Sequence, residues 1–436
     1  MKGSKTSPAN YRPVSLTSVP GKLMESCIKE EIVKHLDRHQ LIQKSQHGFV
    51  KGRSCTTNLL EFLEAATKAV DEGGNMDVIY LDFSKAFDTV PTARLMEKVK
   101  AHGITGPILN WLGNWLKDRT QRVVVNGRMS QQVPVTSGVP QGSILGPILF
   151  IIYINDLEDK FEDTASVLLK FADDTKLAHQ ISSTRDSELL QENLNKLWDW
   201  SSAWGMKFNT EKCHVLHLGR NNPMHRYKMG GEYLIAVEEE KDLGVIITDK
   251  LKPTNQCQKA VRVANGILSQ VLRAFSYRDK VVLPRIFKTY VRPHLEYAVP
   301  VWSPWLRGEV DLMEKVQKRL VSAIQGLKGE SYEEKLLELG IEKLEQRRTR
   351  LDLVQTFKIV KGIDKVNKDT WFQANPETRT RAAQGGGALS RKLSRLELRA
   401  NFFSNRVIGP WNALSPELKQ TESVPSFKYQ LKPHFA

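Results

Sequence analysis

The sequence predicts an α+β fold, in which a part that mixes strands and helices is followed by a mostly helical part. Up to about residue 215, short apolar runs typical of strands alternate with segments of helical periodicity. From about residue 254 onward, periodic and basic helical segments predominate. With 436 residues the chain can form two or three domains and bury a sizeable core.

Four segments carry the strand signals. Residues 77–83 (DVIYLDF) and 121–126 (QRVVVN) are short runs rich in apolar and β-branched side chains. Asn126, the last residue of the second run, is followed by Gly127, and Asn-Gly is a dipeptide that favours a hairpin turn. Residues 167–171 and 175–178 are predicted to be two strands joined by a tight acidic turn.

Helical periodicity extends through most of the remaining chain. The predicted helices cover residues 26–36, 57–70, 92–101, 107–116, 187–204, 254–275, 279–291 and 309–324. Ser331 and Glu334 form a capping-box signature ahead of a further helix. The longest apolar run, 144–154, is too short to span a bilayer and predicts a buried helix. Residues 370–391 contain three consecutive glycines and predict a flexible linker.

The composition favours a folded protein with a polyanionic partner. The formal net charge is +15, from 64 Lys and Arg against 49 Asp and Glu, and 40% of the residues are hydrophobic. Basic side chains that neutralise phosphates release counterions, so this charge favours nucleic acid as the partner. A protein that is basic only for solubility remains the alternative.

The cysteines and the N-terminus indicate an intracellular protein. Cys27, Cys55, Cys213 and Cys257 lie far apart and form no Cys-x-x-Cys pair, so we expect neither a zinc site nor a disulfide framework. The first ten residues, MKGSKTSPAN, are polar and lack the apolar core of a signal peptide. We therefore expect reduced thiols in a protein that is neither secreted nor embedded in a membrane.

Three aspartates lie where apolar strands end or begin. Asp82 lies at the end of the run 77–83, and Asp173 and Asp174 occupy the acidic turn. Neighbouring carboxylates repel, so a cation is expected if they are buried. Hard Mg²⁺ prefers carboxylate oxygens, and two such ions can stabilise an in-line displacement at phosphorus. On the residues alone, a helix-capping Asp82 and a solvated acidic turn remain open.

Seven sequence blocks follow one another in an order typical of a known family. They are NYRPVSL (10–16), QHGFVKGRS (46–54), LDFSKAFD (81–88), SGVPQGSILGPILF (137–150), FADD (171–174), GMKFNTEK (205–212) and KDLGV (241–245). Through them the chain resembles the reverse transcriptases of non-LTR (LINE-type) retrotransposons, most closely the chicken-repeat and jockey-like branch. The resemblance continues through VRPHLEYAVPVW (291–302) to the C-terminus.

This resemblance implies a right-hand polymerase. Residues 1–240 would form the fingers and palm, and residues 241–330 the primer grip and helical thumb. Residues 331–436 would form a helical, basic C-terminal region with a flexible linker near 370–391. Members of the family normally carry an endonuclease domain and further fingers residues ahead of the first block. We therefore expect an N-terminally truncated copy of such an element.

The resemblance also implies a catalytic metal site. Asp82 and Asp173 correspond to the two principal metal ligands, and Asp174 corresponds to a neighbouring auxiliary carboxylate. The backbone carbonyl of Phe83 corresponds to a further ligand. The implied cofactors are two Mg²⁺ ions, with Mn²⁺ as a possible substitute. Lys212 corresponds to the lysine that protonates the departing pyrophosphate, although on the residues alone it is equally a solvated lysine.

Five further positions correspond to substrate contacts. Phe87 corresponds to the steric gate, whose ring excludes a 2′-hydroxyl, whereas on the residues alone it is a core side chain. Gln141 and Gly142 correspond to the loop that approaches the nascent base pair, which a Cβ at the glycine would block. Arg12 corresponds to the arginine that holds the incoming triphosphate, since a planar fork suits phosphate oxygens. Arg53 is either a further substrate contact or a structural arginine.

The expected function is that of an RNA-directed DNA polymerase. Leu243 and Gly244 correspond to its primer grip, and its partners would be an RNA template, a DNA or RNA primer and deoxynucleoside triphosphates. It would act in a ribonucleoprotein in the nucleus or the cytoplasm. The alternative is a catalytically inactive RNA-binding remnant of the element. Phe87, and FADD in place of a Gly-Asp-Asp turn, disfavour an RNA-templated RNA polymerase.

Overall fold

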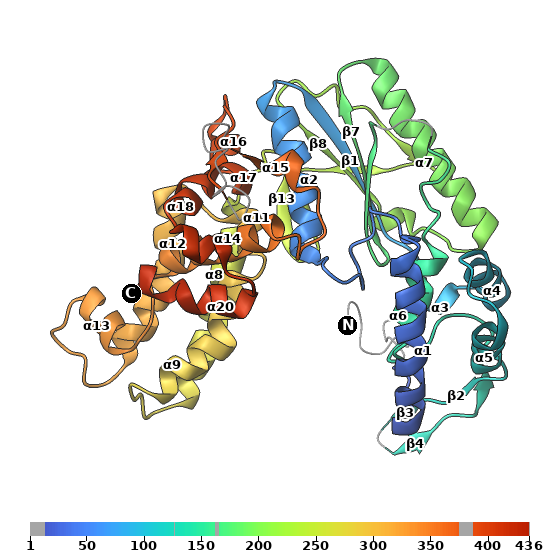
Figure 1. Cartoon of the computed structure of the whole chain (residues 1–436), viewed down its shortest axis with the longest axis horizontal. Coiled ribbons are helices and arrows are strands. Elements are labelled where there is room, and N and C mark those ends of the chain that lie inside the picture. The colour runs from blue at the N-terminus through green and yellow to red at the C-terminus, as the bar shows by residue number, and fades with distance from the viewer. Residues whose placement is uncertain (1–13, 126, 162–164, 375–386, 436) are drawn as a thin grey trace. The chain divides into compact units, whose positions relative to one another are not determined.

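The computed structural model describes residues 14–125, 127–161, 165–374 and 387–435 (Figure 1). The chain divides into two compact units. The first unit comprises residues 1–54, 77–215 and 223–236, and the second comprises residues 55–76, 216–222 and 237–436. Both units combine helices with strands, which confirms the predicted α+β class.

The first unit contains most of the strands. Its helical elements are α1 (Val19–Arg38), α3 (Ala86–Thr89), α4 (Thr92–Ala101), α5 (Gly106–Leu116), α6 (Gly146–Tyr153), α7 (Thr184–Trp204) and the 3₁₀ helix η2 (Thr210–Lys212). Its strands are β1 (Asn75–Leu81), β2 (Thr120–Gln121), β3 (Val124–Val125), β4 (Arg128–Met129), β5 (Val133–Pro134), β6 (Val167–Phe171), β7 (Asp174–Ile181), β8 (His214–Leu218), β9 (Lys228–Met229), β10 (Glu232–Tyr233) and β11 (Ile235–Val237), although β1, β8 and β11 each extend past the limits of this unit.

A five-stranded sheet organises this unit, with the strand order β11-β8-β1-β7-β6. β1 is the central strand and buries six of its seven residues, as expected for a mostly apolar strand with neighbours on both sides. β6 and β7 pair as an antiparallel hairpin from Val167↔Ala178 to Phe171↔Asp174. The predicted pair of strands with an acidic turn is therefore confirmed.

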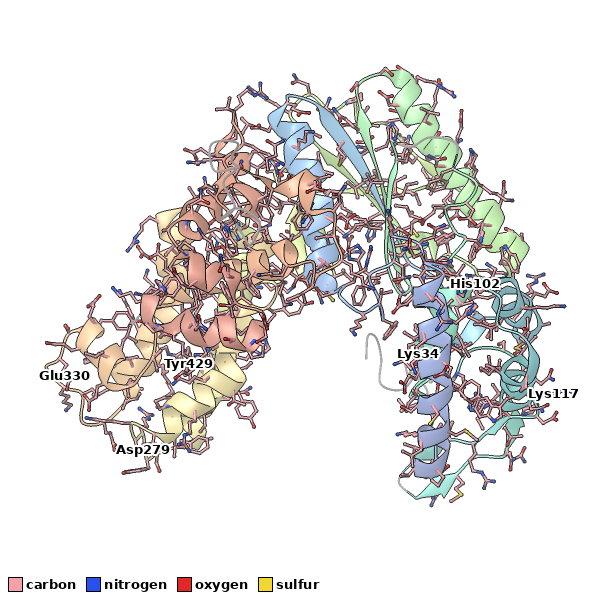
Figure 2. All side chains as sticks on the ribbon, viewed as in Figure 1. Lys34, His102, Lys117, Asp279, Glu330 and Tyr429 are labelled. Atoms are coloured by element: carbon pink, nitrogen blue, oxygen red, sulfur yellow. The ribbon has the colours of Figure 1, made fainter. Side chains whose placement is uncertain are left out.

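Helices bury the apolar side chains of this sheet. All described residues of α6 are buried except Pro147, which confirms the buried helix predicted from the apolar run. α7 begins with a capping box between Ser183 and Asp186 and packs against β7. Figure 2 shows His102, at the end of α4, near α1, where its carbonyl oxygen accepts a hydrogen bond from His35 Nε2 at 2.8 Å.

The loop after α6, residues 154–159, binds two buried lysines through its carboxylates. Lys98 of α4 donates to Asp156 at 2.6 Å, and Trp200 of α7 donates to the same carboxylate at 3.0 Å. Lys98 also lies 3.8 Å from the centre of the Trp204 ring, a cation–π contact. Burial nevertheless lowers the pKa of Lys98 to about 8.

The second lysine of this loop comes from β6. Lys170 is fully buried and lies 2.8 Å from Glu158, which also accepts hydrogen bonds from the Ser45 hydroxyl. Its complete burial lowers its pKa, because the desolvation of the ammonium outweighs the attraction of Glu158. Asn155 completes the loop, since its amide donates to the Leu41 carbonyl at 2.7 Å. One short loop thus connects α4, α7, β6 and the segment after α1.

The second unit is mainly helical. Its helical elements are α2 (Cys55–Asp71), α8 (Thr254–Ala274), α9 (Val282–Ile286), the π-helix η3 (Phe287–Val291), α10 (Arg292–Glu296), α11 (Val299–Trp302), α12 (Arg307–Ala323), α13 (Tyr332–Glu338), α14 (Leu344–Val360), α15 (Lys368–Trp371), α16 (Glu397–Ala400), α17 (Phe403–Arg406), α18 (Ile408–Asn412), α19 (Pro416–Gln420), α20 (Val424–Gln430) and η6 (Lys432–Phe435). Its strands are β12 (Glu239–Asp242), β13 (Val245–Thr248), β14 (Gln373–Ala374) and β15 (Leu389–Ser390).

Packing between distant segments holds this unit together. α12 packs against α8 and α14, and α14 also packs against α20, where Phe357 and Phe427 stack with ring centres 4.2 Å apart. On α2, the buried Glu64 forms an ion pair with the buried Arg399 and accepts a hydrogen bond from Ser404 at 2.6 Å. The C-terminal segment is therefore fixed to a helix that begins at residue 55.

Three sequence predictions need correction. Residues 121–126 do not form one strand, because this exposed segment is divided between the two-residue strands β2 and β3. Asn126 lies outside the described residues. The predicted helix 279–291 begins at Val282 and continues as a π-helix over 287–291. The linker 370–391 is not irregular throughout, since β14 pairs with β15, while residues 375–386 are not described. The Ser331–Glu334 capping box is confirmed.

No helix in the described ranges is long and apolar enough to cross a bilayer.

The Lys170–Glu158 pair yields a prediction for stability. Lys170→Met should lower the free energy of unfolding by about 3 kcal/mol, because Glu158, only 19% exposed, loses its cation. Urea denaturation followed by tryptophan fluorescence measures this loss. The double variant Lys170→Met/Glu158→Gln should recover part of it, since no uncompensated charge remains. Equal destabilisation of the single and double variants would contradict the assignment.

Candidate active site

Asp82 directly follows the central strand β1 and is anchored through its backbone. Its carbonyl oxygen accepts a hydrogen bond from Asn209 N at 2.8 Å, and its N–H donates to Cys213 Sγ at 3.5 Å. Its carboxylate is half-exposed and lies 3.1 Å from Lys212 Nζ. The structure thus brings together two predicted catalytic residues, Asp82 and Lys212, which lie 130 positions apart in the sequence.

Cys213 is a part of this site that sequence reasoning missed. The thiol is fully buried, and burial raises its pKa to about 11, because a thiolate would lose its hydration there. It is therefore a neutral side chain at physiological pH. Its position beside Lys212, at the end of the block GMKFNTEK, was the only available signal.

The geometry of Phe83 directs its carbonyl away from its aromatic partner. Phe83 and Phe208 form an antiparallel bridge, and their rings stack with centres 4.2 Å apart. The hydrogen bonds of this bridge come from flanking residues, such as Ser84 N to Lys207 O at 2.8 Å. In such a pair the central residues point their own N–H and C=O to the opposite edge. The carbonyl of Phe83 therefore faces away from the Phe208 segment.

Asp173 and Asp174 lie at the tip of the β6–β7 hairpin. Phe171 and Asp174 are the last pair of the ladder, so Ala172 and Asp173 form a two-residue turn, in which Ala172 has φ = 54°. Asp174 is exposed, whereas Asp173 is partly buried. Because β7 is the neighbour of β1 in the sheet, the three predicted carboxylates belong to adjacent strands.

The acidic turn is fixed by residues of the block QHGFVKGRS. The buried Gln46 Oε1 accepts hydrogen bonds from Ala172 N at 3.0 Å and from Gly48 N at 2.7 Å. A Cβ at Gly48 would lie 2.4 Å from Ala172 N, so only glycine fits there. Sequence reasoning noted this block but did not assign it this role, which depends on contacts more than 120 positions away.

The carboxylates do not form a closed metal cage in this structure. Among the described residues, no group of three or more His, Cys, Asp or Glu side chains is gathered closely enough to hold a metal ion. The cation closest to Asp82 is the ammonium group of Lys212. The donor types nevertheless fit a hard divalent ion, because each is an oxygen and two of the carboxylates are solvent-accessible.

Phe87 is a half-buried aromatic side chain beside the carboxylate strand. Its ring stacks on Phe150 with centres 4.2 Å apart, and the exposed Phe49 meets it edge-on at 6.5 Å. Its carbonyl oxygen accepts a hydrogen bond from Val139 N at 2.8 Å. The contact with Phe150 agrees with the core alternative, and its incomplete burial leaves part of the ring exposed for the predicted gate.

Gln141 and Gly142 contact other parts of the same unit. Gln141 Nε2 donates to Asp88 Oδ1 at 2.8 Å, and its carbonyl accepts from Ser15 N at 2.7 Å. Gly142 has φ = 97°, and a Cβ there would lie 2.8 Å from the Ser15 carbonyl. The glycine is thus required by the chain itself. The predicted approach to a base pair stays a prediction.

Of the two predicted substrate-binding arginines, Arg12 and Arg53, the structure describes only Arg53. The guanidinium of Arg53 donates to the carbonyl of Lys44 and, at 3.4 Å, to that of Gln46. These bonds favour the structural alternative for Arg53, because they position the segment that holds the acidic turn. Arg12 lies outside the described residues.

Leu243 and Gly244 form a tight turn in the second unit. They connect β12 and β13 as a two-residue hairpin loop with positive φ at both positions, 44° and 92°, the pattern of a type I′ turn. The Leu243 carbonyl accepts from the Tyr297 hydroxyl, and the Gly244 carbonyl accepts from Lys259 Nζ, each at 2.8 Å. The predicted turn exists, and its role as a primer grip stays a prediction.

Comparison with known proteins shows which family the chain resembles. Residues 2–247 match the family described as reverse transcriptase (RNA-dependent DNA polymerase). The chain is 27% identical over 331 residues to the RNA-directed DNA polymerase from mobile element jockey of Drosophila melanogaster, which covers 73% of this chain and 36% of that protein. It is 25% identical over 333 residues to the probable RNA-directed DNA polymerase from transposon X-element of the same fly, with the same shares covered.

The chain spans about a third of the length of these curated relatives. Among solved structures it is similar to a telomerase from Candida tropicalis determined with a fragment of telomeric RNA, with a TM-score of 0.43, 14% identity, and coverage of 79% of this chain and 52% of that chain. The expected resemblance to jockey-like reverse transcriptases is confirmed by the family match and the fly relatives. The chain belongs to the reverse transcriptase (RNA-dependent DNA polymerase) family.

Proposed function

We propose that this chain is an RNA-directed DNA polymerase that adds deoxynucleotides to the 3′ end of a primer. The observation that carries the proposal is the position of Asp82 and of the Asp173-Asp174 turn on adjacent strands of one sheet. Membership of the reverse transcriptase family supports it. Its substrates would be an RNA template, a DNA or RNA primer and deoxynucleoside triphosphates.

Two divalent metal ions, Mg²⁺ or Mn²⁺, fit the donors of the site. The carboxylates of Asp82 and Asp173 and the carbonyl of Phe83 would hold them, with Asp174 as an auxiliary ligand. When bound, such ions stabilise the charge on the attacking and leaving oxygens of phosphoryl transfer. The ion pair with Lys212 supports this role for Asp82, because it shows a carboxylate oriented to stabilise positive charge.

The other predicted residues would position the substrates. The ring of Phe87 would lie beneath the sugar, and Gln141 and Gly142 would border the nascent base pair. Lys212, exposed and next to Asp82, would donate a proton to the leaving pyrophosphate. Arg12 would bind the triphosphate. Arg53 would either bind it too or have only the structural role that its hydrogen bonds favour.

The second unit would hold the primer and the template duplex. The type I′ turn at Leu243 and Gly244 would contact the primer end, and the basic helices that follow would lie along the phosphates. These roles are supported by the net charge of +15 and by the order of the sequence blocks.

Primer extension tests the proposal directly. The purified chain should extend oligo(dT) on poly(rA) in the presence of Mg²⁺, and a chelator should abolish the extension. Salt-dependent binding of the same RNA, measured in parallel, monitors the folded state. Binding without extension would identify the chain as the inactive RNA-binding remnant and refute the polymerase proposal.

The first variant concerns the metal ligands. Asp173→Asn should reduce the extension rate at least about 100-fold, because an amide neither neutralises nor binds a hard cation as a carboxylate does. Asp199→Asn, at an exposed position of α7, is the matched control and should leave the rate unchanged. Wild-type activity in the Asp173 variant would refute the metal assignment.

Lys212 should matter less than the carboxylates. Lys212→Ala should lower the single-turnover rate roughly 10- to 100-fold, because it removes one proton donor and one positive charge. The variant should also need less Mg²⁺ for half-maximal activity, since the ammonium at 3.1 Å no longer competes for Asp82. A Mg²⁺ titration at saturating nucleotide measures both effects, with the exposed Lys207→Ala as the control. An unchanged rate would leave Lys212 as a solvated lysine.

The steric-gate assignment concerns the choice of sugar. Phe87→Val should raise the incorporation of ribonucleotides relative to deoxynucleotides roughly tenfold or more, because a smaller side chain makes room for the 2′-hydroxyl. Phe49→Val removes the ring that meets Phe87 edge-on and controls for altered packing. The ratio of kcat/KM for the two nucleotides decides the matter. If both variants discriminate as the wild type does, Phe87 is a core residue only.

A further inference from the structure

The second unit contains an open polar cavity beside α14, apart from every residue assigned to the polymerase site. It encloses about 210 Å³. Its lining includes Ser303, Arg348, Thr349, Asp352 and Arg406. Since one water needs roughly 10–15 Å³, this volume has room for a small ion together with several waters.

Arg348 is the unusual side chain of this cavity. It is 3% exposed, and its only hydrogen bond within the described chain goes to the Met313 thioether sulfur at 4.0 Å. None of the described carboxylates lies within 4.0 Å of its guanidinium, although its helix neighbours Arg347 and Arg350 both have such partners. A buried guanidinium without an anion is costly, so a counter-ion at this position would stabilise the fold.

The other charges of the cavity already have partners. Asp352 binds Arg406 through two bonds of 2.8 Å, and Arg406 also donates to the Pro300 carbonyl at 2.7 Å. Glu345 is 57% exposed and faces Arg307 at 3.8 Å. Glu345, Glu314 and Asp352 attract the guanidinium of Arg348 from a distance, but none of these carboxylates forms an ion pair with it.

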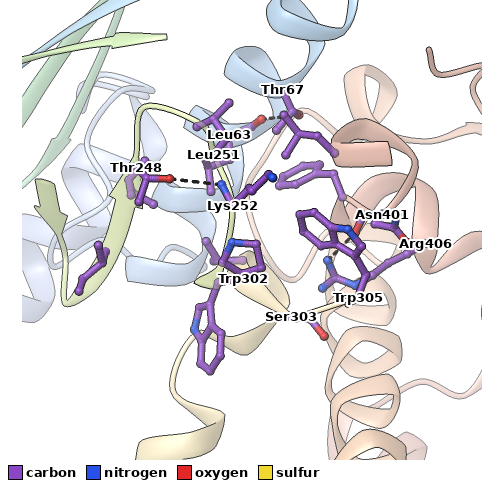
Figure 3. Close-up of a pocket in the computed structure, with 16 residues that line it drawn as sticks. Leu63, Thr67, Thr248, Leu251, Lys252, Trp302, Ser303, Trp305, Asn401 and Arg406 are labelled. Carbon is purple, nitrogen blue, oxygen red and sulfur yellow. Dashed lines mark hydrogen bonds between the residues drawn. The ribbon is translucent and has the colours of Figure 1, made fainter. Parts of the chain in front are cut away.

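A second, narrower pocket limits what can bind. Figure 3 shows this pocket, which shares Ser303 and Arg406 with the polar cavity and is bordered by Trp302 and Trp305. It encloses about 30 Å³, room for only a few waters. This narrow pocket is too small for a nucleobase. A ligand of the neighbouring polar cavity therefore cannot place an attached aromatic ring in it, and the ligand that we consider is a small anionic group.

We infer that the cavity binds a single phosphate group on Arg348. A guanidinium donates two parallel hydrogen bonds to tetrahedral oxyanions, and the Ser303 hydroxyl can supply a further contact. A phosphate oxygen would give this guanidinium the close anionic partner that the described carboxylates do not provide. The group is either inorganic phosphate or a phosphodiester of a nucleic acid backbone. The inference does not depend on polymerase activity.

Thermal unfolding of the full chain tests this site. Inorganic phosphate should raise Tm by about 2–4 °C, compared with chloride at equal ionic strength. Arg348→Gln should lose that shift, whereas Arg350→Gln, two residues further along α14 and paired with Glu342, should keep it. Phosphate also stabilises proteins non-specifically, so the difference between the two variants is the measured quantity. An equal shift in both variants would overturn the inference.

Two further arms identify the source of the phosphate. Thymidylyl-thymidine, which carries one phosphodiester, should reproduce the shift if the site takes a nucleic acid backbone, and inorganic phosphate alone should do so otherwise. If neither produces an Arg348-dependent shift, the cavity has no phosphate site. Asp173→Asn should retain the shift, so loss of polymerization and loss of this site are distinguishable.

A variant that fails to fold does not block the test. Wild-type crystals soaked in tungstate, a heavy analogue of phosphate, should show anomalous density beside Arg348. Tungstate bound only elsewhere, or not at all, would overturn the inference. In the absence of phosphate, Arg348→Met should unfold at a Tm no lower than the wild type, because it removes a buried charge that has no ion pair. A clear loss of stability would instead assign Arg348 a structural role.

Discussion

Two buried lysines impose the main constraint on the first unit. Asp156 and Glu158 belong to one short loop, and each carboxylate neutralises a lysine from another element, Lys98 on α4 and Lys170 on β6. Burying either ammonium without its carboxylate is costly, so the loop fits only where both pairs form together. β6 leads directly into the acidic turn, so the ion pair of Lys170 contributes, with Gln46, to the position of Asp173.

The sequence blocks that the family shares owe part of their character to packing as well as to chemistry. Gly48 is a glycine because the backbone of the acidic turn passes close to it, and Gly142 because the Ser15 backbone does. Where Gly48 meets the acidic turn, Gln46 accepts hydrogen bonds from the backbone N–H groups of both Gly48 and Ala172. Gln46 and Gly48, which have no proposed contact with a substrate, thus hold the turn that carries Asp173.

Local pattern was a good guide to elements and a poor guide to partners. The helix predicted for residues 92–101 has those bounds in the structure, and so does the strand 167–171, because periodicity and apolar runs are local properties. The carboxylates were predicted at the ends of strands for the same reason. Cys213 beneath Asp82 was missed because its contact depends on sequence separation of 131 residues, which no local pattern encodes. The single strand predicted for residues 121–126 was wrong, because the apolar side chains of this exposed segment are not covered by a second layer.

The attachment of α2 to the C-terminal segment has a consequence for synthesis of the chain. Glu64 is buried against Arg399, and the two are 335 residues apart. At a translation rate of roughly 5–20 residues per second, Glu64 waits on the order of tens of seconds before its partner leaves the ribosome. During that time Glu64 lacks the arginine with which it pairs in the folded chain. The second unit can close only after residue 399 has left the ribosome, so its assembly is a late event rather than a progressive one.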